Sequence, residues 1–359
     1  MAYTTIDDPE AYFQTKIYTG NAIDETAITL DGDTDMQPDL IWIKDRDAAQ
    51  HNRLMDSVRG LKEILRSDSN DDDLGSFPLT AGSADGLHSI DSDGFTLTED
   101  DSDYGFNGSG SKTVAWCWKA GGSASSNSDG DITSSVSANT TAGFSIMSYT
   151  GTGSNNTVGH GLNSAPTFTI IRRKDAARNW FVSAVPYTGD TGYLYLHTTT
   201  AGASSGESFF TAKPNATNLL LGDDADANVV SGSYIAYCFA DVAGYSKCGK
   251  YTGNGNADGT FIYTGFKPAW VMVKITSGTD NWNIVDNKRA TYNEAEYTMR
   301  ANLSNAEYTG TAYGIDILSN GFKCRTDDGN FNGSGSTYVY MAFAEAPFVN
   351  SNGVPCNAR

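Results

Sequence analysis

The sequence predicts an all-β protein built from three tandem antiparallel β-sandwich modules of the jelly-roll or lectin-like kind. Three observations support this fold class. The string FNGSGS stands at residues 106–111 and again at 331–336, each time before an apolar stretch. Short apolar runs separated by Gly, Asn, Asp, Ser and Thr fill the middle of the chain. The composition, with 38 Gly, 19 Tyr and 16 Phe, suits short strands and many turns better than helix bundles.

Three anchors set the register of a repeat of roughly 100 residues. The first is Tyr-Thr-Gly, which begins at Tyr18, Tyr149 and Tyr251. The second is a proline followed by an apolar strand and a basic residue, over 38–44, 166–172 and 268–274. The third is the closing apolar strand, over 113–118, 234–239 and 338–343. Repetition of a whole module suits adhesion and assembly better than catalysis, because an enzyme needs a single site.

The anchors divide the chain into five segments. We expect β-sandwich modules over 1–120, 143–244 and 245–349, a Ser- and Gly-rich linker over 121–142, and a C-terminal tail over 350–359. The composition of the linker is typical of a flexible segment, although residues 132–136 could instead pair as an edge strand. The second and third modules are joined so closely that we expect them to pack together.

Within the second module, apolar or alternating runs predict strands over 144–149, 167–172, 180–185, 193–197, 209–212, 219–221 and 234–239. About seven short strands with turn signals between them are typical of an antiparallel sandwich. Evidence for helix is confined to two places. Apolar residues at 54, 58, 61, 64 and 65 favour a short helix over 54–66, and we expect a helical turn within 297–306.

The chain is strongly acidic, with a net charge of −19. This charge argues against binding to nucleic acid or to anionic membranes, since both require a basic face. No apolar stretch approaches the roughly 20 residues of a membrane span. Residues 1–8 lack the features of a signal peptide, so we expect synthesis in a reducing cytoplasm.

The five cysteines predict neither a zinc site nor a disulfide framework, because no CxxC occurs and their number is odd. Cys117 and Cys238 occupy the repeat position at which the third copy has Ala342. A position that accepts Cys or Ala requires a small buried side chain, so we interpret both as inert core thiols.

Carboxylates are the first candidates for chemistry, and their clearest pattern is Asp31-Gly32-Asp33-Thr34-Asp35. Alternating oxygens of this kind could bind Ca²⁺, but the EF-hand pattern is absent and a solvated acidic loop is the alternative. Further acidic runs stand at 68–73, 99–103, 223–226 and 327–328, and we interpret them as solvated turns.

A glycosidase would need a pair of carboxylates, and Asp56 and Asp286 are the acids that the repeat relates. Each is followed three residues later by Arg59 or Arg289, and the second copy has Ala184 at this position. We therefore expect structural ion pairs rather than a catalytic pair. The histidines, at 51, 88, 160 and 197, show no metal-binding spacing, and no Gly-x-Ser-x-Gly precedes a helix. We expect no catalytic residues, no resident cofactor and no enzyme activity.

Tryptophans form the second set of candidates. Trp42 and Trp270 stand on the same predicted strand of two modules, and Trp116 and Trp118 flank Cys117 on one strand face. Burial in the core is the first interpretation. The alternative is a platform on which sugars stack, with nearby Asn and Asp as polar partners.

Three long strings carry a resemblance to a known family: DGDITSSVSANTTAGFSIMSYTGTG…VGHGL, YIAYCFADVAGYSKCGKYTGNGNADGTFIYTGFKPAWVMVK and GSGSTYVYMAFAEAPF. They resemble a repeated domain of unknown function in structural, tail-fibre-like proteins of tailed bacteriophages, notably marine and cyanobacterial ones. The resemblance runs from about residue 12 to 348. It implies a virion protein, assembled in the host cytoplasm, and it brings no catalytic residues.

The functional hypothesis is a tail fibre or spike-type appendage that adheres to carbohydrate on the host surface. The expected partners are other virion proteins, a host glycan and further copies of the chain in a homo-oligomer, for which a trimer is one candidate. A head decoration or adaptor protein with an architectural role is the second hypothesis. A polysaccharide depolymerase is the third.

Overall fold

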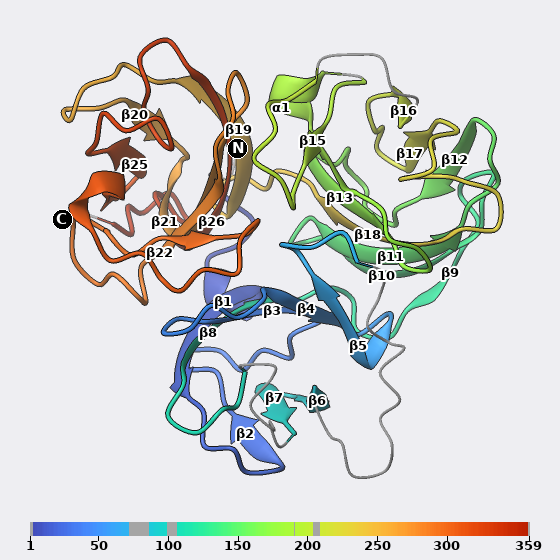
Figure 1. Ribbon diagram of the computed structural model, residues 1–359, viewed down its shortest axis with the longest axis horizontal. Coiled ribbons are helices and arrows are strands. Elements are labelled where there is room, and N and C mark those ends of the chain that lie inside the picture. Colours follow the sequence, from blue (N-terminus) through green and yellow to red (C-terminus); the bar gives the residue numbers. More distant parts are fainter. Residues whose placement is uncertain (1–2, 72–85, 99–105, 190, 204–208, 358–359) are drawn as a thin grey trace.

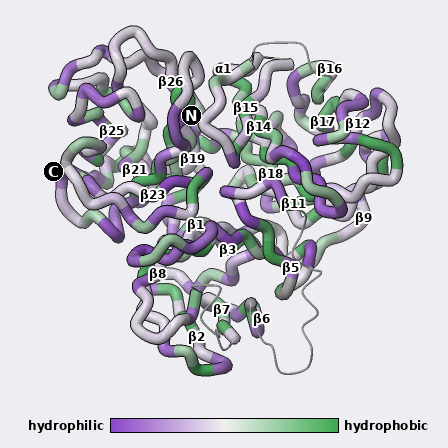
Figure 2. Tube along the Cα trace, in the orientation of Figure 1, coloured by the Kyte–Doolittle hydropathy of each residue, from purple (hydrophilic) through white to green (hydrophobic). Residues whose placement is uncertain are grey.

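The computed structural model describes residues 3–71, 86–98, 106–189, 191–203 and 209–357. It confirms the all-β class. The described strands form six sheets, and all the ladders between named strands are antiparallel. Figure 1 shows three lobes around a common centre. Hydrophobic stretches of the chain occur in every lobe (Figure 2).

Repeat 1 comprises the strands β1 to β8. They are β1 (Phe13–Thr19), β2 (Thr26–Ile28), β3 (Leu40–Asp45), β4 (Arg53–Asp56), β5 (Gly60–Arg66), β6 (Leu87–Asp91), β7 (Gly94–Leu97) and β8 (Lys112–Trp118), preceded by the 3₁₀ turn η1 (Pro9–Ala11). A large sheet has the order β1-β8-β3-β4-β5, and a small sheet has the order β2-β7-β6.

Repeat 2 comprises β11 to β18 and uses the same order. Its elements are β11 (Phe144–Thr150), β12 (Asn156–Gly159), β13 (Phe168–Arg173), β14 (Trp180–Ala184), α1 (Val185–Thr188), β15 (Leu194–Tyr195), β16 (Phe210–Ala212), β17 (Asn218–Leu221) and β18 (Ser233–Phe239). The large sheet contains β15-β14-β13-β18-β11, and the small sheet is β12-β17-β16.

Repeat 3 comprises β19 to β26. Its elements are β19 (Ser246–Thr252), β20 (Phe261–Tyr263), β21 (Phe266–Ile275), β22 (Trp282–Asp286), β23 (Met299–Arg300), η3 (Thr311–Tyr313), β24 (Ile315–Leu318), β25 (Gly321–Cys324) and β26 (Thr337–Pro347). The large sheet is β19-β26-β21-β22-β23, and the small sheet is β20-β25-β24.

Each large sheet is buried on both faces. In repeat 1, one face packs on the small sheet through residues such as Ile41 and Phe95. The other face joins a central core that contains Trp116 of repeat 1, Tyr237 of repeat 2 and Trp270 of repeat 3. The small sheets lie at the periphery and the large sheets face the centre (Figure 1). The three repeats therefore form one body around a shared core.

Residues 54–66 form a hairpin, so the helix predicted there is wrong. Leu54 of β4 pairs with Leu65 of β5, and Gly60 turns the chain with a φ of +122°. Leu54 and Leu65 face the central core, whereas Met55 and Ile64 face the core of repeat 1. Strands buried on both faces lose the alternating pattern, and their apolar residues then imitate helical spacing. The helical turn expected within 297–306 is also replaced, by β23 and a turn.

Residues 121–142 contribute two strands to the large sheet of repeat 2, where we expected a flexible linker. They are β9 (Ser125–Asn127) and β10 (Ser134–Asn139), and β10 pairs with β11 along its whole length. The alternative of a paired strand near 132–136 is confirmed, but this strand is not an edge, because β10 lies between β11 and β9. Serine-rich composition did not prevent strand formation, because β10 still buries Val136 against the core of repeat 2.

Candidate functional site

The Tyr-Thr-Gly anchor ties the first strand of each repeat to the loop before its last strand. Tyr18 Oη donates to the carbonyl of Phe106 at 2.7 Å, and Tyr251 Oη donates to that of Phe331 at 2.7 Å. Tyr149 Oη makes the same contact with Ala227, at 2.6 Å. The anchor is therefore scaffold.

The FNGSGS string is scaffold for the same reason. The amides of Asn107, Asn228 and Asn332 are fully buried and donate to backbone carbonyls of neighbouring loops. Sequence comparison missed Asn228, because the flanking letters of the second copy differ. Each repeat therefore contains the same kind of hydrogen bonds, made by an asparagine in the loop before its last strand.

The basic residue at the end of the second anchor donates a hydrogen bond from its own repeat to another repeat. Lys44 Nζ donates to the carbonyl of Ser304 at 3.0 Å, from repeat 1 to repeat 3. Arg172 Nη2 donates to Asn70 at 2.9 Å, from repeat 2 to repeat 1. Lys274 Nζ donates to Thr199 at 3.2 Å, from repeat 3 to repeat 2. The contacts run in one direction around the centre.

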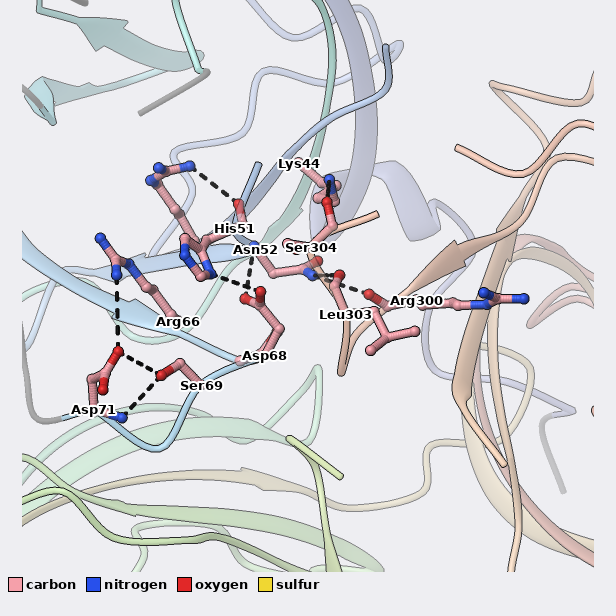
Figure 3. Close-up of polar contacts among 12 residues, drawn as sticks. Lys44, His51, Asn52, Arg66, Asp68, Ser69, Asp71, Arg300, Leu303 and Ser304 are labelled. Atoms are coloured by element: carbon pink, nitrogen blue, oxygen red, sulfur yellow. Dashed lines mark hydrogen bonds and ion pairs between the residues drawn. The ribbon is translucent and has the colours of Figure 1, made fainter. Parts of the chain in front are cut away.

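A second set of donors, at the start of the fourth strand, follows the same direction. Asn52 Nδ2 donates to the carbonyls of Arg300 and Leu303, both at 3.0 Å (Figure 3). Trp180 Nε1 donates to Arg66 at 2.9 Å, and Trp282 Nε1 donates to Tyr195 at 2.9 Å. The acceptors Arg66, Tyr195 and Arg300 hold the equivalent place in their sheets, opposite Arg53, Phe181 and Asn283. The repeats are thus related by an approximate threefold arrangement.

Asp56 and Asp286 form the structural ion pairs that the sequence predicts. Arg59 Nε lies 2.6 Å from Asp56 Oδ2, Arg289 Nε lies 2.6 Å from Asp286 Oδ2, and all four side chains are fully buried. Each aspartate also accepts a hydrogen bond from another repeat, because Tyr237 Oη donates to Asp56 at 2.7 Å and Trp116 Nε1 donates to Asp286 at 2.9 Å. Neither carboxylate is available to a substrate.

At the contact between repeats 2 and 3, the positions of the aspartate and of its aromatic donor are occupied by Ala184 and Met341, both buried in the central core. A hydrogen-bonded pair at two of the contacts between repeats is therefore replaced by an apolar pair at the third contact. This joint change of two positions between repeats is a sequence signal that could have located the interface.

All six tryptophans are buried, so core packing is the correct interpretation and the sugar platform is wrong for them. Trp118 lies edge-on to Trp270, with the ring centroids 5.7 Å apart. Cys117 and Cys238 are buried as expected, and burial raises the pKa of the Cys238 thiol to about 12.

Each histidine contacts a neighbouring carboxylate or backbone group. The backbone N–H of Leu162 donates to His160 Nδ1 at 3.1 Å, and His160 Nε2 lies 3.0 Å from the carbonyl of Asn215. Burial lowers the pKa of His160. His51 Nδ1 lies 2.8 Å from Asp68 Oδ2 (Figure 3). Among the described residues no hydroxyl or thiol joins this pair, so it is not a nucleophilic triad.

The string at 31–35 shows no calcium geometry. Asp31 Oδ2 lies 3.5 Å from Lys16 Nζ, and Asp31 Oδ1 lies 3.5 Å from Lys288 Nζ. No group of three or more His, Cys, Asp or Glu able to hold a metal occurs in the described part of the chain. The acidic run at 99–103 lies outside the described residues, as do the last two residues of the run at 68–73.

A polar cleft of about 950 Å³ opens on repeat 3, beside the C-terminus. It lies between the start of β21, the segment that follows β22, the β24–β25 turn and the tail. Lys267 and Glu345 line it and form an ion pair at 2.8 Å. Asn287 Nδ2 donates to the other oxygen of Glu345 at 2.7 Å, and Asn287 Oδ1 is buried without a partner among the described residues.

The rim of the cleft carries uncommitted polar and aromatic groups. Tyr292 is 85% exposed, which is the highest exposure of any large hydrophobic side chain described. Asn320 stands in the β24–β25 turn, and its carbonyl accepts hydrogen bonds from the backbone N–H groups of Thr264 and Gly265, at 3.0 and 3.2 Å. These backbone contacts hold the turn and leave the side-chain amide of Asn320 for a ligand.

The walls of the cleft are held in place by two asparagines. Asn357 Nδ2 donates to the carbonyls of Ala346 and Pro347, both at 3.0 Å, and so fixes the tail. The amide of Asn293 bonds both the N–H and the carbonyl of Ile317 on the edge of β24. The expected tail at 350–359 is therefore, as far as residue 357, an ordered wall of this cleft. The walls come from five segments that are separate in the sequence, so the sequence alone does not reveal the cleft.

Comparison with known proteins adds one finding. The family model described as a domain of unknown function (DUF7483) matches residues 8–347. No curated protein and no solved structure matches the chain. Among the residues that the structure describes, no helix is both long and apolar enough to cross a bilayer.

Proposed function

This chain belongs to the family described as a domain of unknown function (DUF7483), and from that premise we propose that it is a structural protein of a bacteriophage virion. Its role is that of a tail fibre or spike-type appendage that adheres to carbohydrate on the host surface, without catalysis. Each repeat is a lectin-like or jelly-roll β-sandwich module, within 1–120, 143–244 and 245–349. The resemblance of the chain to tail-fibre-like proteins supports the virion location.

The cleft on repeat 3 is the observation that carries the binding role. A concave site with a few convergent polar groups is the usual form of a ligand site. The groups that repeat in all three copies are committed to the scaffold, whereas the cleft also uses the C-terminal tail, a segment that follows repeat 3 alone. A protein that presents such a cleft on a rigid repeated frame is suited to recognition.

The second candidate is an architectural role, as a head decoration or an adaptor between virion proteins. The continuous contacts between the three repeats favour it, because a rigid body suits assembly. Its partners would be other virion proteins or further copies in a homo-oligomer, such as a trimer. A depolymerase receives no support, since the related acids Asp56 and Asp286 are buried against arginines.

Immunogold labelling of intact virions tests the location, and a whole-cell binding assay with the purified protein tests adhesion. We expect label at the distal end of the tail and binding to host cells. Label on the head would overturn the tail role and favour decoration. Label on the tail without binding to cells would favour an adaptor.

A further inference from the structure

We propose that the cleft on repeat 3 binds a neutral, hydroxyl-rich oligosaccharide, with Tyr292 as the ring on which one sugar stacks. This inference rests on the proposed function, because it names the class of carbohydrate that the adhesion site takes. It is carried by the charge of the lining, by the exposed ring and by the uncommitted hydrogen-bonding groups.

The charges of the lining favour a neutral ligand. Among the described residues that line the cleft, Lys267 and Glu345 are the only charged ones, and their charges cancel. A carboxylate or sulfate group would have to compete with Glu345 for Lys267, in a protein whose net charge is −19. The pair is partly exposed and contributes little by itself, but with both charges already matched the cleft offers a charged ligand no unpaired counter-charge.

Tyr292 supplies an apolar surface. Its side chain makes no hydrogen bond or ring contact with the described residues, and it is 85% exposed. An aromatic ring held in water at the rim of a polar cleft gains free energy when an apolar surface covers it. The C–H face of a pyranose is such a surface, and its hydroxyl groups remain free to bond elsewhere.

The polar groups of the lining match hydroxyl groups. Thr291, Ser319 and Asn320 have side chains that donate and accept hydrogen bonds, and none of them is committed to a partner among the described residues. Asn287 Oδ1 is a buried acceptor without a partner. That oxygen is closed off from solvent, so the groups open to a ligand are the side chains of Thr291, Ser319 and Asn320.

The cleft is also preorganised. Asn357 fixes the tail and Asn293 fixes the edge of β24 through contacts with backbone groups. Walls that are already ordered cost less entropy on binding, so a small set of contacts suffices for a specific site.

The test is binding of the full-length protein to an array of immobilised neutral and anionic oligosaccharides, together with the whole-cell assay. Tyr292→Ala should weaken binding to neutral glycans at least about tenfold, which corresponds to about 1.4 kcal/mol. Asn320→Ala should weaken it less, with the fold intact. Tyr263→Ala is the matched control, because Tyr263 is 54% exposed on the same repeat and does not line the cleft. Raising the salt from about 0.05 to about 0.5 M should leave binding to neutral glycans unchanged.

Three results would overturn the inference. The first is binding to anionic glycans alone, with affinity that falls with salt. The second is binding to neutral glycans that Tyr292→Ala leaves unchanged. The third is adhesion to cells without binding to any neutral glycan, and in this case the adhesion role itself survives. Absence of binding to both cells and glycans would overturn the proposed function as well.

Discussion

Lys44 and Lys274 are cations at fully buried positions, and backbone carbonyls surround them. Lys44 Nζ donates to Asp45 and Ser304, both at 3.0 Å, and Lys274 Nζ donates to Ile275 at 2.7 Å and to Thr199 at 3.2 Å. Carbonyl oxygens carry only partial charges, so they offset the loss of hydration incompletely. Burial therefore lowers the pKa of each lysine to about 8.

The two lysines should consequently contribute stability that rises with pH above about 8, while the four buried thiols, whose pKa burial raises above the ordinary 9.0, contribute the opposite slope. The ordinary pKa of lysine is 10.5, so between pH 8 and 10.5 each of these lysines binds more protons in the unfolded chain than in the folded one. Under that condition the contribution of the lysines to the free energy of unfolding increases with pH. We expect a gain on the order of 1 to 2 kcal/mol per lysine between pH 7.5 and 9.5, measured by urea denaturation at each pH.

Lys44→Met should remove the contribution of one lysine, on the order of 1 to 2 kcal/mol, from the change in stability between pH 7.5 and 9.5. Lys250→Met, which removes an exposed lysine, should leave it unchanged and is the control. The range ends near pH 9.5, because burial raises the pKa of tyrosines such as Tyr237 well above 10, so at higher pH these tyrosines ionise only in the unfolded chain and stability falls. A Lys44→Met variant whose stability depends on pH in the same way as that of the wild type would contradict the assignment.

At the scale of elements, the first and last strands of each repeat are joined by a close backbone approach. A Cβ added at Gly253 would lie 2.4 Å from the carbonyl oxygen of Gly333, and one added at Gly20 would lie 2.3 Å from that of Gly108. The glycine of Tyr-Thr-Gly is therefore required because a side chain would clash with the loop. The tyrosine of the same anchor donates a hydrogen bond to that loop.

Gly253→Ala should destabilise the protein by about 2 kcal/mol or more, because the backbone of the 331–336 loop would have to move. Gly335→Ala is the comparison, since Gly335 has a φ of +72° but open space around its Cβ. It should cost only about 1 kcal/mol, the strain of a left-handed residue. Chemical denaturation of both variants measures the difference, and equal costs would refute the role of close approach.

Strands with strong local patterns could be predicted from the sequence. Features that depend on packing between distant segments could not. The run predicted at 234–239 is β18 (Ser233–Phe239), and that at 144–149 is β11 (Phe144–Thr150), because apolar residues there lie between clear turn signals. The hairpin at 54–66 was missed because both of its faces are buried. The cleft was missed because Lys267 and Glu345 are joined only by the pairing of β21 with β26.

For the whole molecule, the decisive feature is the central core that the three large sheets share. The core includes residues from every repeat, and the buried donors run from each repeat to the next in one direction. The ends of the chain lie together, since the backbone N–H of Ser351 donates to Asp7 at 2.7 Å. The resulting ring differs from a string of independent modules, in which each unit would bury its own apolar surface.

A circular permutant tests whether stability depends on the contacts between the repeats or on the order in which the chain connects them. Joining residue 357 to residue 3 and opening the chain near 121 keeps all three repeats and all their mutual contacts. It should retain the thermal behaviour of the parent protein, apart from a small change from the new loop. It thus provides the matched control for an experiment that removes the contacts themselves.

The full chain should unfold in a single cooperative transition, with calorimetric and van't Hoff enthalpies that agree. An isolated repeat 3, residues 245–349, should fail to form a stable fold. It would expose Trp270, Trp282 and Met341, which are at most 3% exposed in the intact chain, and the lost apolar burial is worth about 25 cal/mol per Å². Differential scanning calorimetry of the chain, and near-UV circular dichroism with dye binding of the fragment, provide the measurements. Three separable transitions, or a fragment with a cooperative transition of its own, would show that the repeats fold independently and that the central core is only a docking surface.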